Sequence, residues 1–301
     1  MNTLATDHLD AIDLENLNAE AALLTRVDRK YLVPLDVANA LATEHAAAFR
    51  ALEIGGLRSF GYASTYFDAH RDTRDGAGAD AWQGFHAAAT GRRHRFKVRT
   101  RTYLDSGEQF LEVKTRTGRG ASLKQRIPLA AHTENGPLTA LDASARAFVD
   151  AALDSAHYPH PVGTLHPVLS TSYRRSTLLH ESGARVTVDT DLAWSGEGAD
   201  AVHAAGAGLG GRHARTCLAV LETKSPAGAG AVDRWLWRAG YRPARISKYA
   251  TGLALLNPHL PANRWHRTLS LLDAPPATGA LGTDQTPGAG QTHSAVGQIH
   301  H

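Results

Sequence analysis

The segments RFKVRTRTY (95–103), FLEVKTR (110–116) and SLKQRI (122–127) decide the fold, because each alternates charged and apolar side chains. Successive side chains of a β-strand point to opposite faces of the sheet, so this spacing gathers the charges on one face. That face carries eight cations and one carboxylate: Arg95, Lys97, Arg99, Arg101, Lys114, Arg116, Lys124, Arg126 and Glu112. Like charges opposite each other on neighbouring strands are destabilising. The pattern therefore indicates either a solvated face with salt-bridging neighbours or a surface that binds a polyanion.

The chain as a whole is nearly balanced in charge. Its 301 residues include 32 Lys and Arg and 29 Asp and Glu, and this net charge of +3 argues against a nonspecific nucleic-acid partner. A hydrophobic fraction of 43% is typical of a soluble globular protein. The positive charge is therefore local, which indicates a site. The single cysteine, Cys217, excludes an internal disulfide, and its apolar surroundings in CLAVL predict a buried thiol.

No targeting or membrane signal is visible in the sequence. The first residues, MNTLATDHLDAIDLE, are acidic and lack the basic and apolar regions of a signal peptide. No stretch of about 18 apolar residues is present, so we expect no membrane span. These features predict a cytoplasmic protein.

Further alternating segments predict more strands in addition to the three basic ones. They are RKYLVP (29–34), GYASTYFDA (61–69), LHPVLSTSYRRSTLLH (165–180), ARVTVDTDLAW (184–194) and LAVLETKS (218–225). Helical patterns cover 8–24, 35–50, 138–156 and 229–239, and another helix begins within RISKYATGLALL (245–256). Residues 195–216 are rich in Gly and Ala and predict a long mobile loop, and the tail from about 273 is expected to be disordered.

This pattern predicts an α+β protein with a closed antiparallel eight-stranded β-barrel and covering helices. The orientation of the faces stays open at this point. Apolar faces that point inward would give a plain barrel with a basic exterior. Apolar faces that point outward, against the helices, would leave the charged faces to line a tunnel.

The second half of the chain adds polar groups to the same face. Either Arg174 or Arg175 points with the charged set. In RVTVDTDL, the residues Arg185, Thr187, Asp189 and Asp191 share one side, and Glu222 and Lys224 share a side in LAVLETKS. The segment RISKY then adds Arg245, Ser247 and Lys248 at the start of a helix, whose backbone amides are suited to anions. Tyr66 and Tyr103 are interpreted as packing residues.

Nine segments, in order along the chain, resemble the VTC (vacuolar transporter chaperone) domain family, within the triphosphate tunnel metalloenzymes, also called CYTH-like. They are RKYLV (29–33), STYFD (64–68), KVRTRTY (97–103), FLEVKTR (110–116), SLKQRIPL (122–129), SYRRSTL (172–178), RVTVDTDL (185–192), VLETKS (220–225) and ISKYATG (246–252). The resemblance implies a tunnel domain over 26–258, after a helical lead-in at 1–25 and before an extension at 259–301.

The resemblance also implies a basic tunnel interior that holds a triphosphate or polyphosphate. Eukaryotic members of the family polymerise inorganic polyphosphate from the terminal phosphate of ATP, with Mn²⁺ or Mg²⁺. Position by position, the catalytic cations would be Lys30, Arg99, Arg101, Lys114 and Lys248. Further phosphate-binding residues would be Lys97, Lys124, Arg126, Arg175, Arg185, Arg245 and Ser247. Glu222 would bind the metal, with Asp189 or Asp191 as a second carboxylate.

The chain departs from the wider superfamily in ways that bear on function. Hydrolase branches begin with Glu-x-Glu-x-Lys, whereas Arg26 to Arg29 precede Lys30 here, which disfavours a two-metal triphosphatase. Arg245 stands where the family often has Lys. We expect neither the regulatory domain nor the membrane spans of the eukaryotic complexes. Three functions remain: a polyphosphate polymerase, which we favour, a hydrolase of tripolyphosphate or nucleoside triphosphates, and a non-catalytic polyphosphate-binding module.

Overall fold

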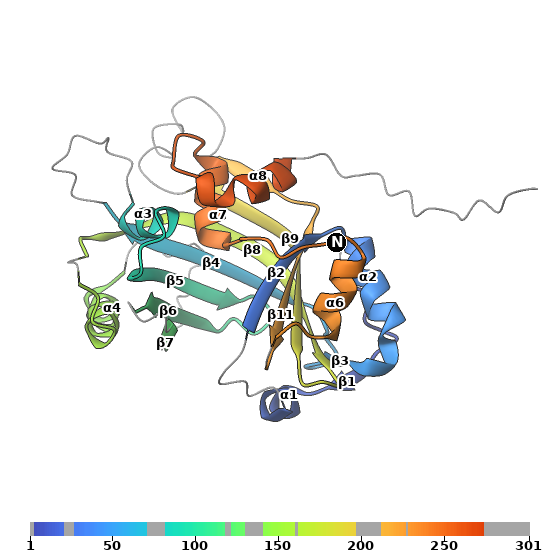
Figure 1. The fold of residues 1–301 in the computed structure, drawn as a ribbon. Coiled ribbons are helices and arrows are strands. Elements are labelled where there is room, and N and C mark those ends of the chain that lie inside the picture. The colour runs from blue at the N-terminus through green and yellow to red at the C-terminus, as the bar shows by residue number, and fades with distance from the viewer. Residues whose placement is uncertain are drawn as a thin grey trace, which may run out of the picture.

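The computed structural model describes residues 3–20, 27–70, 82–117, 122–129, 141–159, 162–196, 212–226 and 228–273. Over these residues, eleven strands form one sheet (Figure 1). The strands are β1 (Asp10–Ile12), β2 (Val27–Val33), β3 (Phe49–Leu52), β4 (Phe60–Ala69), β5 (Arg95–Tyr103), β6 (Gln109–Arg116), β7 (Ser122–Leu129), β8 (Leu165–His180), β9 (Arg185–Gly196), β10 (His213–Arg215) and β11 (Ala219–Ser225). The helices are α1 (Leu14–Glu20), α2 (Leu35–Glu44), α3 (Gln83–Ala89), α4 (Ala143–Ser155), α6 (Ala231–Arg238), α7 (Lys248–Leu256) and α8 (His266–Asp273).

The sheet is open, so the prediction of a closed eight-stranded barrel is wrong. The strands run in the order β2-β11-β9-β8-β4-β5-β6-β7, with antiparallel neighbours throughout, while β1 pairs parallel to β3 at one side. No pairing joins the end strands β2 and β7 within the described residues. The outer edge of β2 is engaged elsewhere, because Ala244 N–H donates to Lys30 O at 2.7 Å. On β7, Pro128 lacks a backbone donor and suits an edge strand.

The apolar faces of the strands pack against helices, which settles the orientation of the charges. On β5 and β6, Phe96, Val98, Leu111 and Val113 form a buried cluster with α4. On β2, β9 and β11, the apolar residues pack with α2 and α6. Figure 1 shows α4 beside β5 and β6, and α2 with α6 at the opposite end of the sheet. The charged side chains therefore occupy the other face.

One end of the charged face is covered by α7, whose residues are almost all buried. Its Tyr249, Ala250 and Leu253 pack in one cluster with Leu32 and Trp194. Trp194 Nε1 donates to Lys248 O at 2.8 Å. A Cβ at Gly252 would lie 2.1 Å from Cδ1 of Trp194, so only glycine allows this approach. This packing fixes α7, and with it Lys248, against the sheet.

Several local predictions change in the structure. The predicted helix at 8–24 is instead β1 followed by α1, and the helix predicted at 35–50 ends at Glu44, before a 3₁₀ turn and β3. Most of the predicted mobile loop at 195–216 and the predicted disordered tail lie outside the described residues. The prediction of a buried Cys217 is wrong, since this residue is exposed and lies outside the strand β11, which begins at Ala219. None of the helices in the described part of the chain is long and apolar enough to cross a membrane.

Candidate functional site

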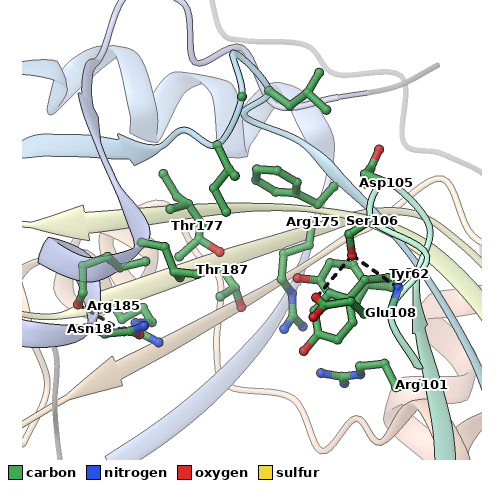
Figure 2. Close-up of a pocket in the computed structure, with 18 of the residues that line it drawn as sticks. Asn18, Tyr62, Arg101, Asp105, Ser106, Glu108, Arg175, Thr177, Arg185 and Thr187 are labelled. Carbon is green, nitrogen blue, oxygen red and sulfur yellow. Dashed lines mark hydrogen bonds between the residues drawn. The ribbon is translucent and has the colours of Figure 1, made fainter. Parts of the chain in front are cut away.

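Two hollows lie along the charged face of the sheet. The first, which we call the α1 hollow, has a volume of 740 Å³ and lies between α1 and the strands β4, β5, β8, β9 and β11. Figure 2 shows Tyr62, Arg101 and Arg175 converging there, with Arg185 and Thr187 on its other wall. The second, which we call the β2 hollow, has a volume of 550 Å³. Its lining includes Lys30, Lys97, Lys114, Arg245 and Ser247.

The strand register sets like charges directly opposite one another. Lys97 on β5 faces Lys114 on β6, which in turn faces Lys124 on β7. One row further along, Arg95 faces Arg116. The register thus confirms the crowded positive charge that the alternation predicted. Such an arrangement is unfavourable unless anionic groups lie among the cations.

Glu112 is the carboxylate that balances this part of the face. Its side chain is only 3% exposed. Its Oε2 accepts from Arg99 Nε at 2.8 Å, and its Oε1 lies 2.7 Å from Lys124 Nζ and 3.9 Å from Arg101 Nη1. Burial acts to raise the pKa of Glu112, but the charges of Arg99, Arg101 and Lys124 outweigh it and lower the pKa to about 2. Glu112 is therefore an ionised centre that holds three of the predicted phosphate-binding cations.

Asp189 plays the same part on β9. It lies opposite Arg175 on β8 and accepts two bonds from it, from Nε at 2.6 Å and from Nη2 at 2.8 Å. Lys248, the first residue of α7, also donates to its Oδ2. Burial acts to raise the pKa of Asp189, but Arg175 and Lys248 outweigh it and lower the pKa. Because both oxygens are bound by cations, Asp189 is poorly placed to bind a metal.

Asp191 does not share the face of β9 that carries Asp189, in contrast to the prediction. Its φ is 51°, and the pairing of β8 with β9 shifts register between Ser172 and Arg174, beside it. Such a bulge re-aims the residues that follow. Val188 packs with α2 and α6, whereas Leu192 packs with α7. The bulge therefore brings Leu192, rather than Asp191, to the side of the sheet that α7 covers.

Glu222 lies opposite Lys30 in the pairing of β11 with β2, and Lys30 Nζ is 2.6 Å from its Oε1. Burial acts to raise the pKa of Glu222, but the charges of Lys30 and Lys224 lower it to about 2. No group of three or more His, Cys, Asp or Glu residues suited to a metal occurs in the described part of the chain. Mg²⁺ and Mn²⁺ are commonly held by one or two carboxylates together with substrate phosphates and water. An ionised Glu222 beside the predicted phosphate-binding cations fits that kind of site.

Lys97 is a strongly perturbed cation of the site. Its Nζ donates to Ser247 Oγ at 2.9 Å and lies 6.0 Å from the ring centroid of Tyr249. Burial, followed by the charges of Lys114 and Arg99, lowers the pKa of Lys97 to about 7. Ser247 also caps α7 by accepting from Ala250 N–H at 3.2 Å. A bound anion in the β2 hollow would favour the charged form of Lys97.

Tyrosines form a second set of contacts that the sequence interpretation missed. Tyr66, interpreted as a packing residue, accepts from Arg99 Nη1 at 3.1 Å. Tyr62 stacks on Tyr173 at 5.2 Å, and the guanidinium groups of Arg101 and Arg175 lie over the Tyr62 ring at 5.4 and 5.5 Å. Lys248 Nζ lies 4.2 Å from the Tyr173 ring centroid. The period-two spacing of Tyr62, Ser64 and Tyr66 was a usable signal, because it places them on one face.

The remaining predicted residues lie at the margins of these hollows. Arg185 Nη2 donates to Leu17 O at 3.2 Å and to Asn18 Oδ1 at 3.1 Å, beside α1. Arg126 lies over the Phe110 ring at 4.8 Å, and Lys114 and Arg245 are exposed beside the β2 hollow. Of the two candidate arginines on β8, Arg175 joins the site, whereas Arg174 Nη2 donates to Ser59 O.

A protein-family model matches most of the residues that build this sheet and site. The VTC domain model matches residues 25–257, which include every strand of the sheet except β1. The chain belongs to the VTC domain family. The resemblance found in the nine segments is therefore confirmed. Among proteins of curated function, the chain has no significant match.

Solved structures similar to this VTC domain protein include three with low identity. A putative adenylyl cyclase from Hippeastrum, described as having a dominant triphosphatase activity, is 13% identical, with 75% of this chain and 94% of that chain covered and a TM-score of 0.39. PH1819 from Pyrococcus horikoshii is 14% identical, with 73% and 95% covered and a TM-score of 0.34. Pfu-838710-001 from Pyrococcus furiosus is 9% identical, with 72% and 88% covered and a TM-score of 0.32. At these scores the similarities carry no argument about chemistry.

Proposed function

We propose that this VTC domain protein is a metal-dependent polyphosphate polymerase, which transfers the γ-phosphate of ATP to the end of a polyphosphate chain. The observation that carries the proposal is the excess of cations along the two hollows. Glu112, Asp189 and Glu222 on the charged face are each held by Lys or Arg. Among the described residues, the linings of the two hollows contain thirteen Lys and Arg residues against the carboxylates of Asp28, Asp105 and Glu108. The Lys and Arg residues that are not bound by a carboxylate need anions from a ligand.

Buried polar atoms support a phosphate ligand in the α1 hollow. Arg101 Nε and Thr187 Oγ1 have no hydrogen-bond partner among the described residues, and both side chains line this hollow (Figure 2). Buried polar groups are nearly always hydrogen-bonded, so such atoms call for a partner. Phosphate oxygens accept hydrogen bonds from both guanidinium and hydroxyl groups. A triphosphate in the hollow would satisfy both atoms once these side chains turn toward it, because neither atom is exposed to solvent in the present arrangement.

The chemistry follows from the cations and needs no protein nucleophile. Phosphoryl transfer depends mainly on in-line positioning and on stabilising charge on the transferred group. We assign this part to Lys30, Arg99, Arg101, Lys114 and Lys248. On substrate binding, phosphate oxygens would compete with Glu112 and Asp189 for the cations that these carboxylates now hold. Bidentate arginines would orient the chain, and lysines would act as point charges.

Mn²⁺ or Mg²⁺ is the proposed cofactor. Glu222 would hold the ion with substrate oxygens and water, and the ion would neutralise charge on the phosphates. Lys30, which now binds Glu222, would then turn to phosphate. We do not assign Asp189 to the ion, because Arg175 and Lys248 occupy both of its oxygens.

The decisive assay incubates purified protein with ATP and Mn²⁺ and separates the products by chain length. We expect long acid-labile phosphate chains. The Glu222→Gln variant should lose about 100-fold or more of the rate, since a catalytic metal supplies several kcal/mol. Glu181→Gln, at an exposed position, is the matched control.

Two results would overturn the proposal. Release of orthophosphate without chains would mean that water is the acceptor and the protein is a hydrolase. Tight polyphosphate binding without turnover would mean a non-catalytic binding module. If Glu222→Gln kept normal metal dependence, the metal assignment would be wrong.

A further inference from the structure

Four arginines surround a third hollow, which we call the arginine hollow. It has a volume of 410 Å³ and is lined by Arg242, Arg245, Arg264 and Arg267. The first two come from the segment between α6 and α7, Arg264 from the 3₁₀ turn Asn263–Trp265, and Arg267 from α8. No Asp or Glu occurs among the described residues that line it. The hollow is thus basic without an internal counter-charge.

The arginine hollow continues from the β2 hollow. Arg245 and Arg264 line both of them, together with Pro243 and Ala244. The β2 hollow also contains Lys97 and Lys114. Cations therefore extend from the charged face of the sheet, past the edge strand β2, to α8. A ligand that follows them would need to be long and negatively charged along its length.

The charges on this path are crowded. Burial, followed by the charges of Arg116 and Arg264, lowers the pKa of Arg95. Within the described part of the chain, no salt bridge joins Arg264 or Arg267 to a carboxylate. The guanidinium of Arg264 lies against Gly91, where a Cβ would be 2.1 Å from Arg264 Nη1 and would require that side chain to shift. Gly91 has a φ of 71°, which also favours glycine.

We propose that the arginine hollow binds the part of a linear polyphosphate chain that extends beyond the β2 hollow. The proposal rests on the function proposed above and extends it to residues that the VTC domain match does not include, because Arg264 and Arg267 lie beyond residue 257. Linear polyphosphate repeats one anionic unit, which suits a row of separate arginines. Guanidinium forks bind phosphate oxygens well in exposed positions. Tripolyphosphate has only three phosphate units and is far shorter than such a chain.

The test compares the affinities of long-chain polyphosphate and tripolyphosphate for three purified double variants. For Arg264→Gln/Arg267→Gln, we expect long-chain affinity to fall about 3- to 30-fold, from the loss of two exposed ion pairs, whereas tripolyphosphate affinity should fall less, because only Arg264 also lines the β2 hollow. The salt dependence of long-chain binding should weaken, because fewer counterions are displaced. Arg264→Lys/Arg267→Lys should keep most of the affinity. Arg215→Gln/Arg238→Gln makes the same charge change at exposed positions outside the three hollows and should bind as the wild type.

Unchanged long-chain affinity in the glutamine variant would overturn the proposal, as would an equal loss for both ligands. If the double variant fails to fold, the single Arg267→Gln variant at its exposed position allows the same comparison. The binding assay requires no turnover. A protein that makes no polyphosphate but shows the selective loss would refute the polymerase and keep the arginine site. A protein that makes polyphosphate but shows no selective loss would keep the polymerase and refute the arginine site.

Discussion

Replacing Glu112 by Gln tests whether the charged face is held together by its own carboxylates. The substitution keeps the shape of the side chain and removes its charge. Arg99 and Lys124, which Glu112 binds at 2.8 and 2.7 Å, then lose their anionic partner. Because the side chain is 3% exposed, water can replace little of that interaction.

The magnitude follows from the pKa of Glu112. Its pKa is lowered from 4.5 to about 2, because its cations outweigh the effect of burial. A difference of about 2.5 pKa units corresponds to about 3 kcal/mol of folding free energy at pH 7. A lowered carboxylate pKa stabilises the fold fully above pH 4.5, and the contribution is lost as the pH falls toward 2. At pH 3 it should amount to about 1 kcal/mol.

Urea denaturation of wild type and Glu112→Gln at pH 7 and pH 3 would measure this difference. We expect the variant to be about 3 kcal/mol less stable at pH 7, and the difference to shrink at pH 3. Added tripolyphosphate should reduce the difference at pH 7, since phosphate oxygens can pair with the same cations. Glu181→Gln, at an exposed position, is the control. Equal stability at pH 7, or a difference that does not change with pH, would refute the reasoning.

Three further substitutions test other contacts of the site. Asp189→Asn should destabilise the fold by about 3–5 kcal/mol in chemical denaturation, because it leaves Arg175 buried without its anion; a neutral result would show that other groups hold that cation. Lys97, with its pKa lowered by burial and neighbouring cations to about 7, loses its charge as the pH rises past 7, so wild-type affinity for tripolyphosphate should fall between pH 7 and 9. Lys97→Arg stays charged and should remove that part of the pH profile; an unchanged profile would contradict the assignment. Tyr249→Phe removes the hydroxyl that donates to buried Asp68 and should cost about 1–3 kcal/mol of stability in a urea titration; no loss would mean that the backbone donors suffice.

The alternation of side chains determined which face of each strand carries charge. Period-two spacing is a local property of an extended backbone, so Lys97, Arg99 and Arg101 share a face in any sheet that contains β5. The same spacing, with the order of the nine segments, was enough to recognise the VTC domain family. Lys30 and Glu222 were identified from the sequence alone, and the structure places them 2.6 Å apart on neighbouring strands.

The sequence could not show whether the sheet closes, because the strands of open and closed sheets have the same alternation of side chains. In the tertiary structure the strand order ends at β2 and β7 within the described residues, and a distant segment contacts the edge of β2 through the bond from Ala244 N–H to Lys30 O. Asp191 was misplaced for a related reason, since a bulge depends on how two strands pair and leaves no period of its own. The partners of Glu112 and the grouping of Arg242, Arg245, Arg264 and Arg267 likewise arise only when separate elements meet. The sequence by itself thus determined the charges and their faces, whereas the partners of those charges depend on packing between residues far apart in the chain.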